Sequence, residues 1–172
     1  MSRRLLPPLL ASVLLLASGC ERAVADPRPD AAGPAVVPAA DEVAHGEYMV
    51  LMGGCNDCHT ARFGERGGDV PKDEWLTGNQ LGFHGPWGTS YPTNLRLTID
   101  ALDEAQWLVY TANLHTRPPM PDYQLRAMRE EDRRAIYRFI RSLGPAGAPA
   151  PAALPPGQTP PPPYFQLVLP TG

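Results

Sequence analysis

The five residues Cys55–His59, which read Cys-Asn-Asp-Cys-His, constrain this chain more than any other stretch. Two cysteines three positions apart at the end of a helix present both sulfurs on one side of the backbone, and a histidine follows directly. At this spacing two thiols can add to the vinyl groups of one haem while the imidazole binds its iron. We therefore expect one covalently attached haem c, bound through Cys55 and Cys58, with His59 as the proximal iron ligand.

Two other chemistries use a Cys-x-x-Cys pair. A dithiol redox couple is one, but it usually follows a strand in a βαβ unit, whereas the residues before Cys55 have a helical pattern. Half of a zinc site is the other, but zinc generally takes four ligands, and the third cysteine, Cys20, lies near the N-terminus. The histidines that remain to complete such a site are His45, His84 and His115.

The composition predicts one modest domain with linkers on either side. The chain has 172 residues and a formal charge of -3, which gives no indication of nucleic-acid binding. Its 22 prolines and 16 glycines concentrate outside the middle of the sequence, as in linkers around a small core. A covalently held haem would supply the hydrophobic centre that such a core lacks.

The N-terminus has the layout of a secretory signal peptide, which we assign to residues 1–19. Two arginines precede an apolar stretch that is too short to span a bilayer, and small residues then precede Cys20. The stretch Leu16–Cys20 resembles a bacterial lipobox, so we expect Cys20 to carry a lipid anchor. The rival interpretation is ordinary cleavage after Ala25, which would discard Cys20 and release a soluble protein.

Either route exports the chain, and we expect a periplasmic protein lipid-anchored to a bacterial membrane. Removing the leader, with its two arginines and no acids, changes the formal charge from -3 to -5. A docking partner should then present a basic face. Residues 20–40 are rich in Asp, Pro and Ala without periodicity, which predicts a flexible tether.

Three helices are predicted in the haem domain, residues 41–144. The first runs over 42–52 with Asp41 as its N-cap, and Gly46 in its middle indicates either a closely approaching helix or an exposed neutral site. The second covers 102–114, with acidic residues at its start. The third and clearest covers 129–143, where apolar residues recur at helical spacing.

Met120 is the predicted distal iron ligand. Three prolines flank it in 117–121, so a stiff loop presents its thioether, and the residue lies on no periodic apolar face. His115 is the next candidate. Less favoured are Met49, Met52, Met128 and His84.

The segment 61–97 has no sustained period but holds aromatic rings among glycines, as expected of a loop around a flat apolar cofactor. A backbone carbonyl near Pro71 or Pro86 is expected to accept the Nδ1 proton of His59. The Pro-rich tail, 145–172, ends in the apolar residues 164–169. We expect that end to dock on the domain as an extended strand, the alternative being a partner-binding arm.

Residues 41–144 resemble the class I c-type cytochromes, most closely the single-haem domains of bacterial periplasmic dehydrogenases and respiratory chains. The matching stretches are 46–48, 54–60, 91–95, 119–121 and 135–144. The resemblance implies an all-α class I cytochrome c fold with extended Pro/Gly-rich loops. It also implies that the first and last helices cross, and that His59 and Met120 lie on opposite haem faces. Relatives often run from Asn-Leu directly into Thr-Pro-Asp, whereas this chain has a different stretch at 96–100.

The function expected from these features is outer-sphere electron transfer by a protein that is not itself an enzyme. Its partners would be redox proteins, a dehydrogenase as donor or an oxidase as acceptor, because His/Met ligation raises the reduction potential. The alternative is a haem enzyme or gas sensor in which the sixth position is open and Met120 merely packs. The sequence shows no hydrolytic triad, phosphate loop or paired carboxylates.

Overall fold

The structure is a computed structural model that describes residues 39–170. The predicted signal peptide, Cys20 and the tether up to residue 38 lie outside the described residues. None of the described helices is long and apolar enough to cross a membrane. In chain order the elements are α1 (Ala39–Met52), α2 (Cys55–His59), the 3-10 turn η1 (Lys72–Glu74), β1 (Gly82–Gly85), β2 (Gly88–Ser90), α3 (Leu95–Asp100), α4 (Glu104–Ala112), α5 (Asp122–Ala127), α6 (Glu130–Leu143) and β3 (Tyr164–Gln166).

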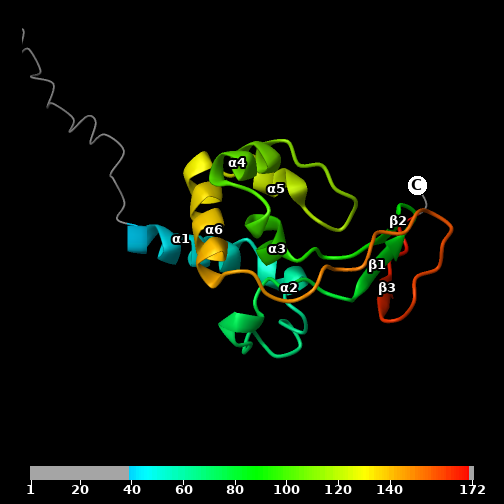
Figure 1. Ribbon diagram of the computed structural model, residues 1–172. Coiled ribbons are helices and arrows are strands. Elements are labelled where there is room, and N and C mark those ends of the chain that lie inside the picture. The colour runs from blue at the N-terminus through cyan, green and yellow to red at the C-terminus, as the bar shows by residue number, and fades with distance from the viewer. Residues whose placement is uncertain (1–38, 171–172) are drawn as a thin grey trace, which may run out of the picture. The chain divides into compact units, whose positions relative to one another are not determined.

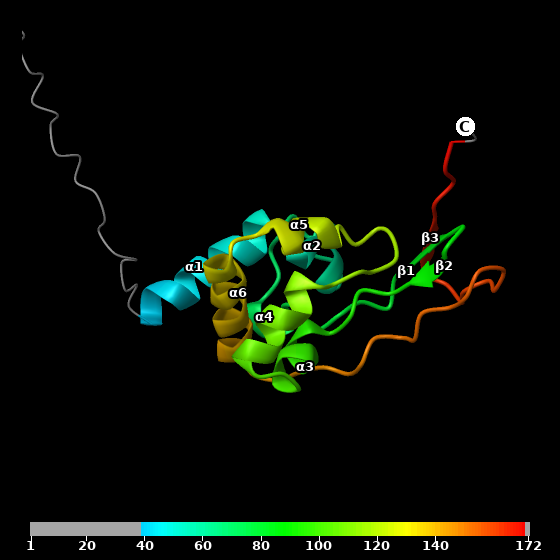
Figure 2. The ribbon, with the colours of Figure 1, turned by 90° about the horizontal axis from the view of Figure 1, so that it is seen from above.

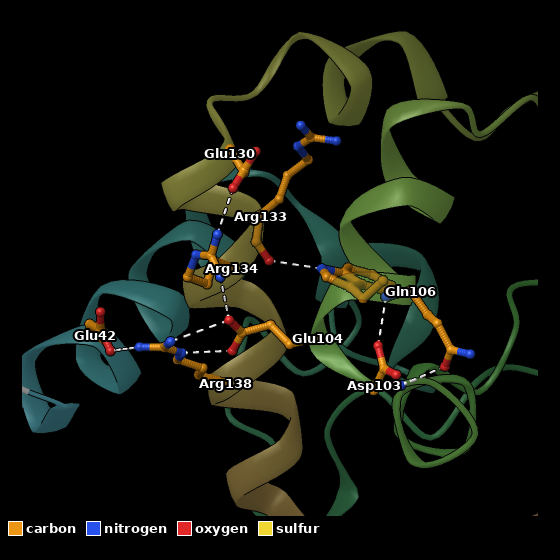
Figure 3. A network of polar contacts seen from close by, with 9 residues as sticks. Glu42, Asp103, Glu104, Gln106, Glu130, Arg133, Arg134 and Arg138 are labelled. Atoms are coloured by element: carbon orange, nitrogen blue, oxygen red, sulfur yellow. Dashed lines mark hydrogen bonds and ion pairs between the residues drawn. The ribbon is translucent and has the colours of Figure 1, made fainter.

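The three predicted helices are confirmed as α1, α4 and α6, with small shifts at their ends. Helix α1 begins at Ala39, so Asp41 lies in its first turn and is not its N-cap. Helix α4 begins later than predicted, because Asp103 caps it: the Asp103 carboxylate accepts the backbone N–H of Gln106, and the Gln106 side chain accepts that of Asp103 (Figure 3). This reciprocal capping box fixes the first turn.

Helices α1 and α6 cross in direct contact (Figure 1). Gly46 lies at the crossing, where a Cβ atom would be 2.0 Å from the carbonyl oxygen of Ala135 and 2.7 Å from Cβ of Phe139. The expectation that Gly46 marks a close helix approach is therefore confirmed. The core beside this crossing includes Val50 of α1 and Ile140 of α6, which are almost completely buried.

A network of charges ties α1 and α4 to α6 on their partly exposed sides (Figure 3). Arg138 of α6 pairs with Glu42 of α1 and, at 2.8 Å, with Glu104 of α4. Arg134 pairs with Glu104 and, at 2.5 Å, with Glu130. Because Glu104 pairs with two arginines of α6, it fixes the position of α4 along α6 on this partly exposed side.

The predicted all-α class I cytochrome c fold is wrong for this chain, because the described residues also form a three-stranded mixed sheet in the order β2-β1-β3. Strand β1 pairs antiparallel with β2 and parallel with β3, which places Phe83 opposite both Ser90 and Phe165. The sheet lies away from α1 in both ribbon views (Figures 1 and 2). Its strands are three or four residues long, too short to show a period of two in the sequence.

The prediction that the tail docks its end as a strand is confirmed by β3, which is in the tail and pairs with β1. The ring centroids of Phe83 and Phe165 lie 5.7 Å apart. Docking is incomplete, since Phe165, Val168 and Leu169 remain 54%, 85% and 55% exposed. The beginning of the tail is also held, because Asn94 Nδ2 donates to the carbonyl of Ala146 at 2.8 Å.

Candidate functional site

The short helix α2 carries all three residues of the Cys-x-x-Cys-His motif. Helix α1 ends at Met52, and two glycines turn the chain into α2, with Gly53 N donating to the carbonyl of Met49 at 2.8 Å. The crossing of α1 with α6 therefore sets the position of α2. At its far end, His59 is followed by Thr60, whose buried hydroxyl accepts the backbone N–H of Leu76 at 2.8 Å.

Cys55 and Cys58 are free, half-buried thiols. Burial raises the pKa of Cys55 to about 11 and also raises the pKa of Cys58. Both thiols are therefore protonated at neutral pH. Reactive dithiol couples need the opposite, a lowered thiol pKa in an electropositive environment, so this site does not suit a redox dithiol.

His59 is held in one orientation by a single strong hydrogen bond. Its side chain is buried, and Nδ1 lies 2.7 Å from the carbonyl oxygen of Thr93. Because a carbonyl only accepts, Nδ1 carries the hydrogen and Nε2 keeps its lone pair. Burial lowers the pKa of His59, which keeps the ring neutral. A neutral imidazole with a fixed tautomer and a free Nε2 is the form that binds a metal.

The expected partner of His59, a carbonyl near Pro71 or Pro86, was therefore wrong. The partner is Thr93, in the segment that connects β2 to α3. The sequence did single out 91–95 as a matching stretch, but it gave no reason to choose that carbonyl. Which carbonyl faces a ring depends on the path of the whole loop between α2 and α3.

Two adjoining cavities surround His59, enclosing about 650 and 920 Å³ of space that is partly open to solvent. Five residues line both cavities: Cys58, His59, Thr93, Thr116 and Met120. The rest of the first lining is Phe83, Ser90, Tyr91, Pro92, Arg117, Pro119 and Ala153, and the second adds mainly apolar side chains, among them Leu95, Trp107, Leu114, Leu125, Met128 and Ile136.

The walls of the two cavities are mostly apolar, with a cluster of thiols and an imidazole from α2. The two thiols and the ring of His59 reach the cavities from α2, while apolar and aromatic side chains supply most of the other walls. Arg117 is the one lysine or arginine among the lining residues of these two cavities. A flat, largely apolar cofactor that forms thioethers to both cysteines fits this lining, and a polar substrate does not.

Met120 lies in the wall that the two cavities share with His59. It belongs to the loop between α4 and α5, whose end is closed by Asp122: the carboxylate accepts the backbone N–H of Thr116 at 2.5 Å and pairs with Arg126 at 2.8 Å. The structure thus brings together Cys55, Cys58, His59 and Met120, all of which the sequence singled out.

The other candidate ligands are placed less favourably. His115 is exposed and lines neither cavity, and His84 Nδ1 lies 2.8 Å from the hydroxyl of Thr89 outside both linings. Met52 is 65% exposed, and Met49 packs against the core. Met128 does line the second cavity, beside Gly53. It is the one competing thioether in these walls.

The aromatic residues divide between the cavities and the core. Phe83 and Tyr91 line the first cavity, and Trp107 and Tyr110 line the second. Trp107 is only 2% exposed, and its Nε1 donates to the carbonyl of Arg133 at 2.8 Å. Trp107 therefore belongs to the core, and it also forms part of the cavity wall.

Sequence reasoning did not single out three residues of the cavity linings. Thr93 and Thr116 are hydroxyl residues in loops, and Ala153 lies within an alanine- and proline-rich run. None belongs to a periodic face or a metal-ligand motif. The signals in the sequence were the position of Thr93 within the matching stretch 91–95 and the proximity of Thr116 to Met120.

The described residues provide no alternative metal site: nowhere in 39–170 do three or more His, Cys, Asp or Glu side chains gather to hold an ion. The zinc interpretation of the cysteine pair therefore finds no ligand set in this part of the chain. Comparison of the chain with models of protein families, with curated proteins and with solved structures gives no match.

Proposed function

We propose that this protein is an electron carrier, a c-type cytochrome in which Cys55 and Cys58 bind one haem through thioethers and His59 and Met120 are its axial ligands. The observation that supports this best is that His59 and Met120 share the walls of two adjoining apolar cavities next to both free thiols. When bound, the haem supplies a one-electron couple between ferric and ferrous iron.

Each residue has a separate task in this proposal. Thr93 accepts the Nδ1 proton of His59, which keeps the ring oriented and increases its basicity as a ligand. The loop around Met120 presents a neutral thioether, and a neutral sulfur ligand favours the reduced state. With both axial positions filled there is no open position for a substrate, so the carrier role is favoured over catalysis.

The mouth of the cavities is where a redox partner would approach. Electrons would pass to or from a docked dehydrogenase or oxidase over a small, short-lived interface. The charge of the mature chain favours a partner with a basic face. Export to the periplasm and a lipid on Cys20 are part of the proposal, supported by the sequence of the leader.

The ligand set can be tested on protein exported together with a haem-attachment system. The ferric protein should show the weak long-wavelength absorption band of a methionine-iron bond, and Met120→Ala should remove it and allow carbon monoxide to bind the reduced protein. Met128→Ala is the matched control, because Met128 lines the same second cavity. That variant should keep the band and exclude carbon monoxide.

Two results would refute the proposed ligand. A band that disappears in Met128→Ala and persists in Met120→Ala would assign the sixth position to Met128. A wild-type protein that has no such band and binds carbon monoxide freely would have an open sixth position, as a haem enzyme or gas sensor does.

A further inference from the structure

The tail passes directly beside the loop that carries Met120, and Leu154 is the point of contact. Leu154 N donates to the carbonyl of Thr89, and Thr89 N donates to the carbonyl of Leu154, both at 3.0 Å. This antiparallel bridge adds the tail to the outer edge of β2. Thr89 is fully buried beneath it.

The fit at this bridge is close. A Cβ atom on Gly88 would lie 2.2 Å from the carbonyl oxygen of Leu154, so the tail runs against bare backbone. Gly88 also has a φ of 95°, which side chains rarely adopt. The contact therefore depends on glycine at this position, and it holds residue 154 against the edge strand β2.

The loop that carries Met120 also contacts the tail at Leu154. Arg117, three residues before Met120, donates from Nη1 to the carbonyl of Leu154 at 2.9 Å. The backbone carbonyl of its neighbour Pro118 accepts a hydrogen bond from the hydroxyl of Ser90 in β2 at 2.8 Å. The Met120 loop is thus attached to the tail on one side and to the sheet on the other.

The attachment lies at the cavity itself. Arg117, Pro119 and Met120 line the first cavity from the loop, and Ala153 lines it from the tail. The tail residue just before the bridge, Ala153, therefore forms part of the cavity wall. Movement of Met120 out of the cavity must carry Arg117 with it, because only two residues separate them.

We propose that the tail is a strap that positions Met120: Arg117, held by the carbonyl of Leu154, limits how often the loop lifts Met120 from the cavity. This rests on the proposed function, in which Met120 is the sixth ligand. Arg117 and Leu154 are positioning residues here, since neither contacts the iron. The closure of the loop by Asp122 and Arg126 is separate and stays intact when Arg117 is changed.

The rate at which imidazole replaces the methionine in the ferric protein measures how often the loop opens. Arg117→Ala removes one charge-assisted hydrogen bond in an exposed place, so imidazole should associate about 5-fold faster. The methionine-iron band should keep its full intensity, because the ligand set is unchanged. Arg62→Ala is the matched control, an exposed arginine whose one ion-pair partner among residues 39–170 is Glu65, and its rate should equal that of the wild type.

A double-mutant cycle tests whether Arg117 acts through the tail. Deletion of residues 150–172 should speed association by itself, and Arg117→Ala should add nothing in that background. If the shortened chain does not fold, Leu154→Pro replaces it, because proline removes the N–H that Thr89 accepts. Hydrogen exchange of residues 113–121 should also rise in Arg117→Ala, a readout that does not depend on the iron.

The strap is refuted if Arg117→Ala leaves both association and exchange at wild-type rates, or if its effect is equally large with and without the tail. Failure of the proposed function has a different signature. In that case imidazole binds the wild type at the rate of Met120→Ala, because methionine never occupied the sixth position.

Discussion

Replacing Gly46 by alanine tests whether α1, which leads into the Cys55–His59 motif, crosses α6 in close contact. The new Cβ would lie 2.0 Å from the carbonyl oxygen of Ala135, whereas ordinary contact begins at 3.4 Å. The helices must therefore separate by about 1.4 Å, the difference of those two distances. The opposing atoms belong to the backbone and to Cβ of Phe139, so no side chain can rotate away.

The expected loss follows from two opposing terms. Alanine is favoured over glycine inside a helix by about 1 kcal/mol. Overpacking a core that cannot relax costs about 3 kcal/mol, at the upper end of the usual range. We expect Gly46→Ala to lower the free energy of unfolding by about 2 kcal/mol, measured by urea denaturation of the protein.

Gly64→Ala is the control, because no heavy atom lies within 4 Å of the Cβ that it would add. Its stability should stay within about 0.5 kcal/mol of the wild type. If Gly46→Ala proves as stable as Gly64→Ala, the helices do not meet at Gly46 and the close crossing is refuted.

Two further substitutions test the elements around the site. Asp132→Asn should cost about 1 kcal/mol at pH 7, since Arg129 and then His45 bond the carboxylate and hold the pKa of Asp132 below its ordinary value. This contribution is present above the ordinary pKa and lost as pH falls through the depressed one, so urea denaturation should show the gap closing at low pH; a gap that persists there contradicts the pairing. Arg96→Ala should cost about 3 kcal/mol in the same assay, because buried Arg96 donates to the carbonyls of Asp73, Leu143 and Gly144, which would lose their partner. A loss below that of exposed Arg62→Ala would mean that these bonds do not stabilise the fold.

Local sequence patterns predicted the long helices well. They could not predict the pairing of strands that lie far apart in the chain. The helix over 129–143 was clear because apolar residues recur on one face and an acidic first turn precedes them. Strand β1 was missed because its partner β3 lies some eighty residues later and neither strand alternates. The all-α expectation failed for that reason.

The candidate site also contains residues that the sequence predicts and contacts that only the fold creates. Cys55, Cys58 and His59 follow from a local motif, and the prolines around Met120 mark it from the sequence alone. The carbonyl of Thr93 and the contact of Arg117 with Leu154 depend on how loops are brought together by the fold. No residue type or spacing in the sequence predicts these two contacts.

The most direct test of the central claim is the intact mass of denatured protein after export with a haem-attachment system. We predict an increase by the mass of one haem that survives denaturation, and its loss when Cys55→Ser and Cys58→Ser are combined. A wild-type protein that carries no such mass, with both cysteines still free to react, would contradict the assignment of Cys55 and Cys58 to haem.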